Sequence, residues 1–173
     1  MGTSIAFVSI KGGVGKTTLA LETASALAND FDKKVLLVDA NFSAPNIGLY
    51  LDLKKDLTLH NILSDEEGLH AAIYEAYGID VVPASLYFGN VVDPFKLKKV
   101  LEKHKNKYDF IIIDSSPHHS EMLPAIVAAD KIFVVTTPDR VTLYTSLKAA
   151  RLAKQNNAPV EGVIINKVTN SEY

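Results

Sequence analysis

The sequence predicts an α/β protein in which a mostly parallel β-sheet is flanked by helices on both faces. Short runs rich in β-branched residues alternate with longer helical patterns along the whole chain, as in repeated βαβ units. Residues 110–113 form a continuous apolar run, which is typical of a strand buried on both faces. A glycine-rich turn also joins the first apolar run directly to the first helical pattern. These three observations favour parallel strands connected by helices.

Each element follows from a local pattern. We expect strands at residues 4–10, 34–39, 79–82, 108–114, 131–136 and 160–166. We expect helices at residues 16–29, 57–63, 67–77, 94–105, 121–128 and 141–156. Asp93 and Pro94 have the residue types of an N-cap and a first helical position, and Pro159 marks the break before the last strand.

Length and composition limit the classes of protein. The 173 residues fit one domain, 1–173, which can bury about 70% of the surface of the unfolded chain. A net charge of −2 gives no general basic field for nucleic acid. The absence of cysteine excludes disulfides and a cysteine-ligated metal within these residues. No run approaches the ~20 apolar residues that span a bilayer, so we expect a soluble protein, and the absence of cysteine favours a cytoplasmic one.

Residues 11–18 form a phosphate-binding loop that ends in a lysine and two threonines. The sequence is Lys-Gly-Gly-Val-Gly-Lys-Thr-Thr. Glycines allow backbone N–H groups to surround an anion, and the following helix N-terminus adds positive charge. Lys16 would contact the β- and γ-phosphates, and the Thr17 hydroxyl would hold Mg²⁺. We therefore expect ATP or ADP with Mg²⁺ to bind Gly12, Gly13, Val14, Gly15, Lys16, Thr17 and Thr18.

The head of this loop departs from the usual pattern, because Ile10 occupies the first glycine position and Lys11 opens the loop. A lysine at this position resembles the deviant Walker A ATPases of the MinD and ParA family, which belong to the SIMIBI class of P-loop proteins. The resemblance implies a P-loop NTPase fold and slow ATP hydrolysis. It also implies a nucleotide-dependent homodimer, in which Lys11 serves the partner subunit's nucleotide. Such a dimer switches the binding of a regulatory or cargo protein in cell division, partitioning or positioning.

Polar residues at the ends of the predicted strands extend the resemblance. Asp39 resembles the first acid of the family's first switch, which supports the Mg²⁺ shell, although such an acid can also simply cap a turn. Asn41 stands where the family has the acid that orients the attacking water, and an amide is a weaker base. A structural role for Asn41 is equally compatible with the sequence. Asp114 ends an apolar run that resembles Walker B, whose acid holds an Mg²⁺-bound water. Asn166 resembles the asparagine that hydrogen-bonds the adenine edge.

The histidines carry little specific signal. His118 and His119 interrupt the small residues and glycine of the family's second switch. Adjacent residues of an extended chain point apart, so we interpret this pair as an exposed switch or partner contact rather than a metal site. We expect His60, His70 and His104 to be solvated on helix surfaces.

Three segments are candidate contact surfaces. Residues 84–93 contain apolar side chains that suit a partner surface or internal packing equally well; these are Leu86, Tyr87, Phe88, Val91 and Val92. Residues 136–139 resemble a family segment near the nucleotide or dimer contact, and turn chemistry explains them equally well. The lysines of residues 96–107 could face DNA or an acidic membrane, although a solvated helix face is favoured.

Other functions fit parts of the same pattern. A nucleotide-binding interaction module with little or no hydrolysis is supported by Asn41 and the altered second switch. An iron–sulfur carrier or assembly ATPase is disfavoured because the chain has no cysteine. An amide-forming ligase would need a substrate pocket. Family members usually continue beyond a point like residue 173, so we expect a shortened member or a fragment, and peripheral membrane association stays open.

Overall fold

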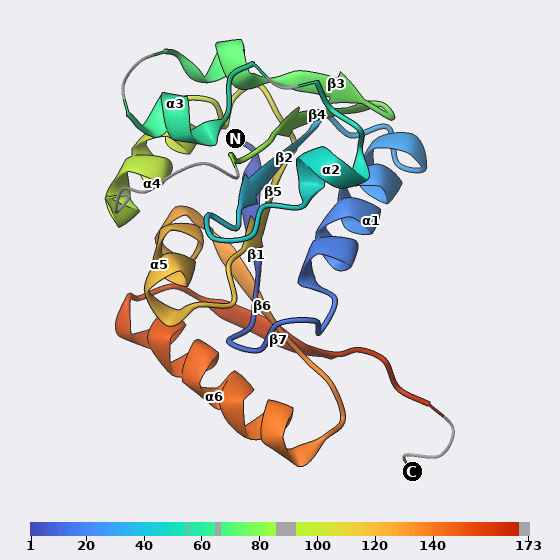
Figure 1. Cartoon of the computed structure of the whole chain (residues 1–173), viewed down its shortest axis with the longest axis vertical. Coiled ribbons are helices and arrows are strands. Elements are labelled where there is room, and N and C mark those ends of the chain that lie inside the picture. Colours follow the sequence, from blue (N-terminus) through green and yellow to red (C-terminus); the bar gives the residue numbers. More distant parts are fainter. Residues whose placement is uncertain (55, 65–66, 86–92, 170–173) are drawn as a thin grey trace.

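The computed structural model describes residues 1–54, 56–64, 67–85 and 93–169. Within these residues a seven-stranded sheet has the order β3-β4-β2-β5-β1-β6-β7 (Figure 1). The strands are β1 (Thr3–Val8), β2 (Val35–Ala40), β3 (Tyr74–Ala76), β4 (Ile79–Val82), β5 (Phe110–Ser115), β6 (Lys131–Thr136) and β7 (Val160–Ile165). Every pairing is parallel except that of β3 with β4. The predicted mostly parallel sheet is confirmed.

Helices cover both faces of this sheet. They are α1 (Lys16–Asn29), α2 (Ile47–Tyr50), α3 (Leu59–Leu63), α4 (Pro94–Glu102), α5 (His119–Ala128) and α6 (Arg140–Gln155), with a 3₁₀ helix at Leu69–Ala72. One core lies under α1 and α2 and includes Ala20, Ala24 and Ile47. The other core lies under α3 to α6 and includes Leu97 and Met122. Figure 1 shows α1 on one side of the sheet and α4 and α5 on the other.

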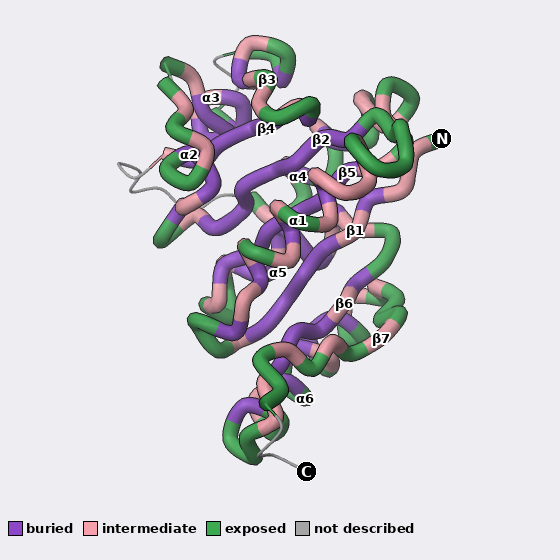
Figure 2. Tube along the Cα trace, turned by 90° about the vertical axis from the view of Figure 1, so that its right-hand side faces the viewer, coloured by how far each residue is buried: buried purple, intermediate pink, exposed green. Residues whose placement is uncertain are grey.

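The central strands are buried, as their continuous apolar sequence predicts. All six residues of β2 are buried, and so are the last five of β5 (Figure 2). The parallel register pairs Asp114 with both Phe7 of β1 and Asp39 of β2. The carboxyl ends of these three strands therefore reach the same edge of the sheet.

One predicted helix is wrong. Residues 67–77 were expected to be helical, but the chain forms the 3₁₀ helix and then β3, which turns back into β4. Tyr77 and Gly78 make the turn with φ values of 51° and 78°. Two consecutive positive φ angles match the right-handed twist of a hairpin, so the antiparallel pairing outweighs the helical pattern. The short helix α2 was not predicted.

The expectation for His60 is also wrong, because this side chain is buried with 1% of its surface exposed. Its Nδ1 accepts a hydrogen bond from the Ser85 backbone N–H at 3.0 Å, and its ring meets Phe42 edge-on at a centroid distance of 5.3 Å. Burial lowers the pKa of His60 to about 4. His104 is half-buried beside the Val100 carbonyl, whereas His70 is exposed as expected.

The candidate contact surfaces have different outcomes. Leu86, Tyr87, Phe88, Val91 and Val92 lie outside the described residues, so both interpretations of that segment stay predictions. The basic helix is shorter than expected, and its cap is confirmed because the Asp93 side chain accepts from the Phe95 N–H. Lys105 lies beyond the helix and pairs with Asp130 at 2.6 Å. Among the described residues no helix combines the length and apolarity needed to cross a membrane.

Candidate functional site

The candidate site lies where the carboxyl ends of β1, β2 and β5 meet. The neighbouring strands β1 and β5 continue into α1 and α5, which pack on opposite faces of the sheet. The chain segments that follow β1 and β5 therefore turn to opposite faces of the sheet and leave a crevice between them. In parallel α/β sheets ligands bind in such a crevice. The loop at residues 11–15 fills it from the β1 side.

Backbone conformation explains two glycines of the loop. Gly13 and Gly15 have φ values of 75° and 99°, which residues with a Cβ rarely adopt. A Cβ at Gly15 would also lie 2.3 Å from Asn166 Nδ2. Gly15 is the residue before α1 and offers no side-chain cap, so the first N–H groups of the helix are not used by a capping side chain.

Two residues directly after β7 donate hydrogen bonds to backbone carbonyls of the loop at residues 11–15. Asn166 Nδ2 donates to the Val14 carbonyl at 2.8 Å, which places the predicted adenine contact directly beside the loop. Lys167 Nζ donates to the Gly13 carbonyl at 2.7 Å. Sequence reasoning missed Lys167, and its position directly after Asn166 was the available signal.

The charged centre of the site consists of Lys16, Thr17 and Asp114. The Thr17 hydroxyl donates to Asp114 Oδ2 at 2.6 Å, and Lys16 Nζ lies 3.4 Å from the Lys11 carbonyl. Burial lowers the pKa of Lys16, and attraction to Asp114 opposes this shift. Burial raises the pKa of Asp114 to about 6, although the Thr17 hydrogen bond, the Lys16 charge and the Ser115 backbone N–H counteract it. A polyanion and a divalent cation would each compensate one of these buried charges.

Two buried oxygens in the site have no hydrogen-bond partner within the described part of the chain. They are Asp114 Oδ1 and Asn41 Oδ1. Buried polar atoms normally have partners, so these oxygens call for a ligand or ordered water. The Asp114 carboxylate and the Thr17 hydroxyl that donates to it are oxygen ligands, the type that Mg²⁺ prefers. The residues present therefore fit a bound Mg²⁺.

Asp39 is buried at the end of β2 and caps the following loop. Its Oδ1 accepts from the Asn41 N–H and its Oδ2 accepts from the Ile47 N–H, both at 3.1 Å. The Asn41 side chain closes the same loop by donating from Nδ2 to the Ala44 carbonyl at 2.7 Å. This is the turn-capping role that the sequence left as an alternative, and support of an Mg²⁺ shell by Asp39 stays a prediction.

Lys11 lies against α6 of its own chain. Its Nζ donates to the Thr142 hydroxyl at 2.6 Å and lies 3.5 Å from Asp139 Oδ2. Asp139 is the N-cap of α6 and accepts from the Thr142 N–H at 2.9 Å. Hydrogen bonds from the Thr137 and Thr142 side chains, and then from the Thr142 backbone, hold the pKa of Asp139 well below its usual range. The segment 136–139 thus has both the expected turn chemistry and a direct contact with Lys11.

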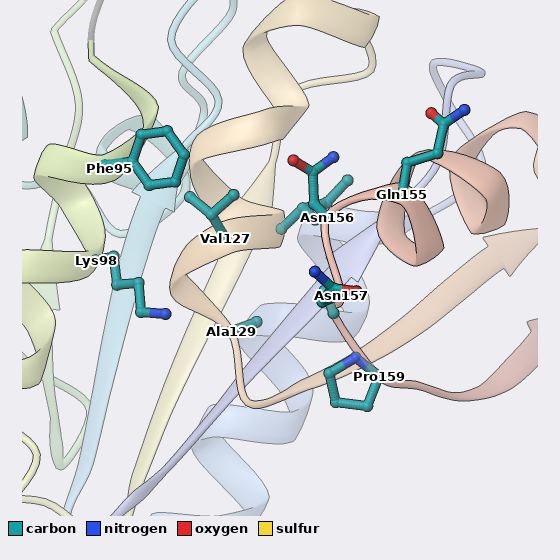
Figure 3. Close-up of a pocket in the computed structure, with 10 residues that line it drawn as sticks. Phe95, Lys98, Val127, Ala129, Gln155, Asn156, Asn157 and Pro159 are labelled. Carbon is teal, nitrogen blue, oxygen red and sulfur yellow. The ribbon is translucent and has the colours of Figure 1, made fainter.

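A second hollow lies at the opposite end of the sheet, where β6 and β7 begin (Figure 3). This pocket has a volume of about 300 Å³, and Phe95, Lys98, Asn156 and Pro159 are among its lining residues. Because it lies at the amino ends of the strands, it could not present a substrate to a nucleotide bound at residues 11–15. It gives no support to the ligase alternative.

Comparison with known proteins agrees with this geometry. The model of a family described as an AAA domain matches residues 2–155. An ATP-binding protein of Methanocaldococcus jannaschii is 34% identical over 95% of this chain and 64% of its own length. A virulence plasmid ParA family protein of Chlamydia psittaci is 30% identical over 98% of this chain and 73% of its own length. The chain thus spans about two thirds of the length of the first of these relatives.

Solved structures give the same result. The cell division ATPase MinD of Pyrococcus furiosus superposes with a TM-score of 0.87 at 32% identity, covering 95% of this chain and 72% of that protein. The septum site-determining protein MinD of Pyrococcus horikoshii, solved with Mg-ADP, has a TM-score of 0.87 at 31% identity over 95% of this chain and 70% of its own. By sequence, by fold and by the lysine that opens its phosphate loop, the chain belongs to the MinD/ParA family of P-loop proteins.

Proposed function

We propose that this protein binds Mg-ATP, hydrolyses it slowly and uses the cycle to form and dissolve a homodimer. The observation that carries the proposal is the convergence of Lys16, Thr17 and Asp114 at the N-terminus of α1. A buried ammonium, a hydroxyl and a carboxylate with a free buried oxygen are the groups that a nucleotide phosphate and its metal require. Mg-ADP in the Pyrococcus horikoshii relative supports the same ligand here.

Each residue has a role that follows from its position. The N–H groups of residues 12–18 and the Lys16 ammonium would neutralise the β- and γ-phosphates. Bound Mg²⁺ would supply further positive charge, held by Thr17 and through water by Asp114, with Asp39 beside them. Asn166 would contact the adenine, because its side chain already lies against the loop at Val14.

Hydrolysis depends on how the attacking water is held. Asn41 Oδ1 is a buried acceptor without a partner in the described residues, so it can orient a water but hardly deprotonate it. Positioning without a strong base gives slow turnover, which suits a protein that acts as a switch.

Dimerisation would move the Lys11 side chain from contacts within its own chain to the nucleotide of the partner subunit. In the single chain Lys11 is held by Thr142 and Asp139 at the start of α6. In the ATP-bound dimer it would leave them and reach the nucleotide of the partner subunit. A regulatory or cargo protein would bind only one of the two states. DNA and a membrane surface are further candidates for binding the dimer.

One observation favours a second candidate function, a nucleotide-binding module with little hydrolysis. A carboxylate is absent at position 41, and the amide nitrogen there is engaged by the Ala44 carbonyl. Single-turnover measurements separate the candidates, because ATP would remain intact for hours on a pure binding module.

Calorimetry with Mg-ATP tests the nucleotide site itself. Lys16→Ala removes the buried ammonium, and charge-assisted contacts to phosphate are worth about 3 kcal/mol, so we expect a loss of affinity of at least about 100-fold. Lys33→Ala changes an exposed lysine before β2, distant from the loop in the chain, and should bind as wild type. Equal affinity of Lys16→Ala and wild type would show that residues 11–18 do not bind the phosphates.

A further inference from the structure

Two loops at the candidate site are joined by a polar cluster that lies outside the phosphate loop. Ser43 comes from the loop after β2, whereas Ser116, His118 and Glu121 come from the end of β5 and the start of α5. We call these four residues the loop clasp. Ser43 lies two positions after Asn41, and Ser116 lies two positions after Asp114.

Ser116 is the centre of the clasp. It is fully buried, it donates to Glu121 Oε2 at 2.9 Å, and it accepts from the His118 N–H at 3.2 Å. The Ser43 and Ser116 hydroxyl oxygens lie 3.3 Å apart. His118 Nδ1 lies 3.1 Å from Ser43 Oγ, 3.4 Å from Ser116 Oγ and 3.9 Å from Glu121 Oε2.

Counting protons assigns the direction of these hydrogen bonds. A carboxylate only accepts, so the single hydroxyl proton of Ser116 is used by Glu121. The contact between the two hydroxyls therefore needs the proton of Ser43. Ser43 then has no proton for His118, so His118 Nδ1 must be the donor. If Nδ1 were the acceptor, the contact of 3.3 Å between the serines would have no proton.

We propose that His118, with its proton on Nδ1, fastens the loop that carries Asn41 to the strand end that carries Asp114. In this role His118 is a positioning residue for ATP hydrolysis, and this part of the inference rests on the proposed function. The hydrogen bonds run from His118 to Ser43, from Ser43 to Ser116 and from Ser116 to Glu121.

The need for such a device follows from the chemistry of position 41. A neutral amide contributes to hydrolysis only by placing water correctly, and small displacements of a positioning group are costly. The contacts that Asn41 makes with Asp39 and Ala44 hold the loop to itself and to β2. The clasp joins that loop to β5, and so fixes Asn41 relative to Asp114.

Single-turnover hydrolysis at saturating Mg-ATP is the first test. His118→Ala should lower the rate by about 10-fold while ATP affinity changes by less than about 3-fold, because the clasp does not include the phosphate loop. His119→Ala is the matched control, since the side chain of this neighbouring exposed histidine makes no hydrogen bond within the described residues, and it should keep the wild-type rate. Equal rates for the two variants would overturn the proposal.

Two conservative variants test which ring nitrogen matters. An asparagine amide can place a donor near the position of Nδ1, whereas a glutamine amide extends to the position of Nε2. His118→Asn should therefore retain more activity than His118→Gln. The double variant Ser43→Ala/His118→Ala should be no slower than His118→Ala, because both changes break the same chain of hydrogen bonds. Additive losses, or a faster glutamine variant, would contradict the clasp.

The tautomer of His118 provides a readout that does not need hydrolysis. In nucleotide-free protein at pH 8, imidazole ¹⁵N chemical shifts should show the proton on Nδ1, and Ser43→Ala should shift the population toward the Nε2-protonated form. Wild-type protein that binds ATP without hydrolysing it would refute the proposed ATPase, and the tautomer would then decide the clasp alone. A proton on Nε2 in the wild type would overturn the clasp whatever the activity.

Discussion

Gly12 and Gly15 lie three residues apart in the same loop but meet different constraints. The Gly15 backbone has a φ of 99°, and a Cβ added there would lie 2.3 Å from Asn166 Nδ2. A Cβ added at Gly12 would have no atom within 4 Å. Gly15→Ala should therefore lower stability by about 2 kcal/mol, or about 4–8 °C in Tm. Gly12→Ala should unfold within about 1 °C of wild type. Thermal unfolding of the nucleotide-free proteins measures both, and equal melting temperatures would contradict the loop geometry.

Asn41 allows a test of the water-positioning role. Asn41→Asp supplies the missing base, and positioned bases typically contribute about 10²–10⁴-fold, part of which the amide already provides, so single-turnover hydrolysis should rise by roughly 10-fold. The change has a cost, because a carboxylate oxygen would replace Nδ2, which donates to the Ala44 carbonyl at 2.7 Å. The nucleotide-free variant should therefore melt about 2–4 °C lower. A variant that binds and dimerises normally but is no faster would show that Asn41 is not at the water position.

At the scale of elements, α3 contributes a buried titratable group beneath the loop after β2. His60 has a folded pKa of about 4, whereas an unfolded histidine titrates near 6.5, so between these values the unfolded chain binds more protons. Stability should therefore fall as the pH falls through this window, by about 2–3 kcal/mol in total. Urea unfolding of wild type and His60→Gln at pH 7, 5.5 and 4.5 measures the difference.

Two comparisons isolate the contribution of His60. Taking the difference between wild type and variant at each pH cancels the opposite contribution of Asp114, whose raised pKa favours the folded state as the pH falls. His70→Gln replaces an exposed histidine and should follow the wild-type curve. Parallel curves for wild type and His60→Gln would show that His60 does not stay neutral in the folded protein.

The sequence predicted those elements whose signal is local. The parallel strands were found because each carries a short run rich in apolar, β-branched residues, and α1 was predicted with its observed bounds because the phosphate loop fixes its start. The hairpin of β3 and β4 was missed because Tyr74–Ala76 is short and its partner, not its own pattern, makes it a strand. Burial of His60 likewise depends on Phe42 and Ser85, which the chain brings together only when folded.

The candidate site likewise has features that the sequence predicts and features that only the fold reveals. The phosphate loop could be predicted because its residues are consecutive. The bonds from Lys11 to Thr142 and from Ser43 to His118 join residues 131 and 75 positions apart, and a single sequence does not reveal such pairs. Asp39 was assigned to the metal shell from its resemblance to the first acid of the family's first switch, and only the folded loop shows that both of its oxygens accept backbone N–H groups.

At the scale of the whole molecule, Lys11 joins the glycine-rich loop after β1 to the start of α6. The α6 surface carries the exposed apolar side chains of Val141, Tyr144 and Leu147 close to the residues that hold Lys11. Movement of Lys11 to a partner subunit would release Asp139 and Thr142 at the start of this helix. Nucleotide state, the first turn of α6 and dimerisation would then change together.

The most direct test of the proposed switch is the mass of the protein in solution, measured by size-exclusion chromatography with light scattering. We expect the monomer mass of 18.8 kDa without nucleotide and with Mg-ADP, and twice that mass with Mg²⁺ and a non-hydrolysable ATP analogue. Lys11→Ala should bind the analogue and remain monomeric, whereas Lys33→Ala should dimerise like wild type. A wild-type protein that stays monomeric with saturating analogue, or a Lys11→Ala variant that dimerises fully, would contradict the proposed switch.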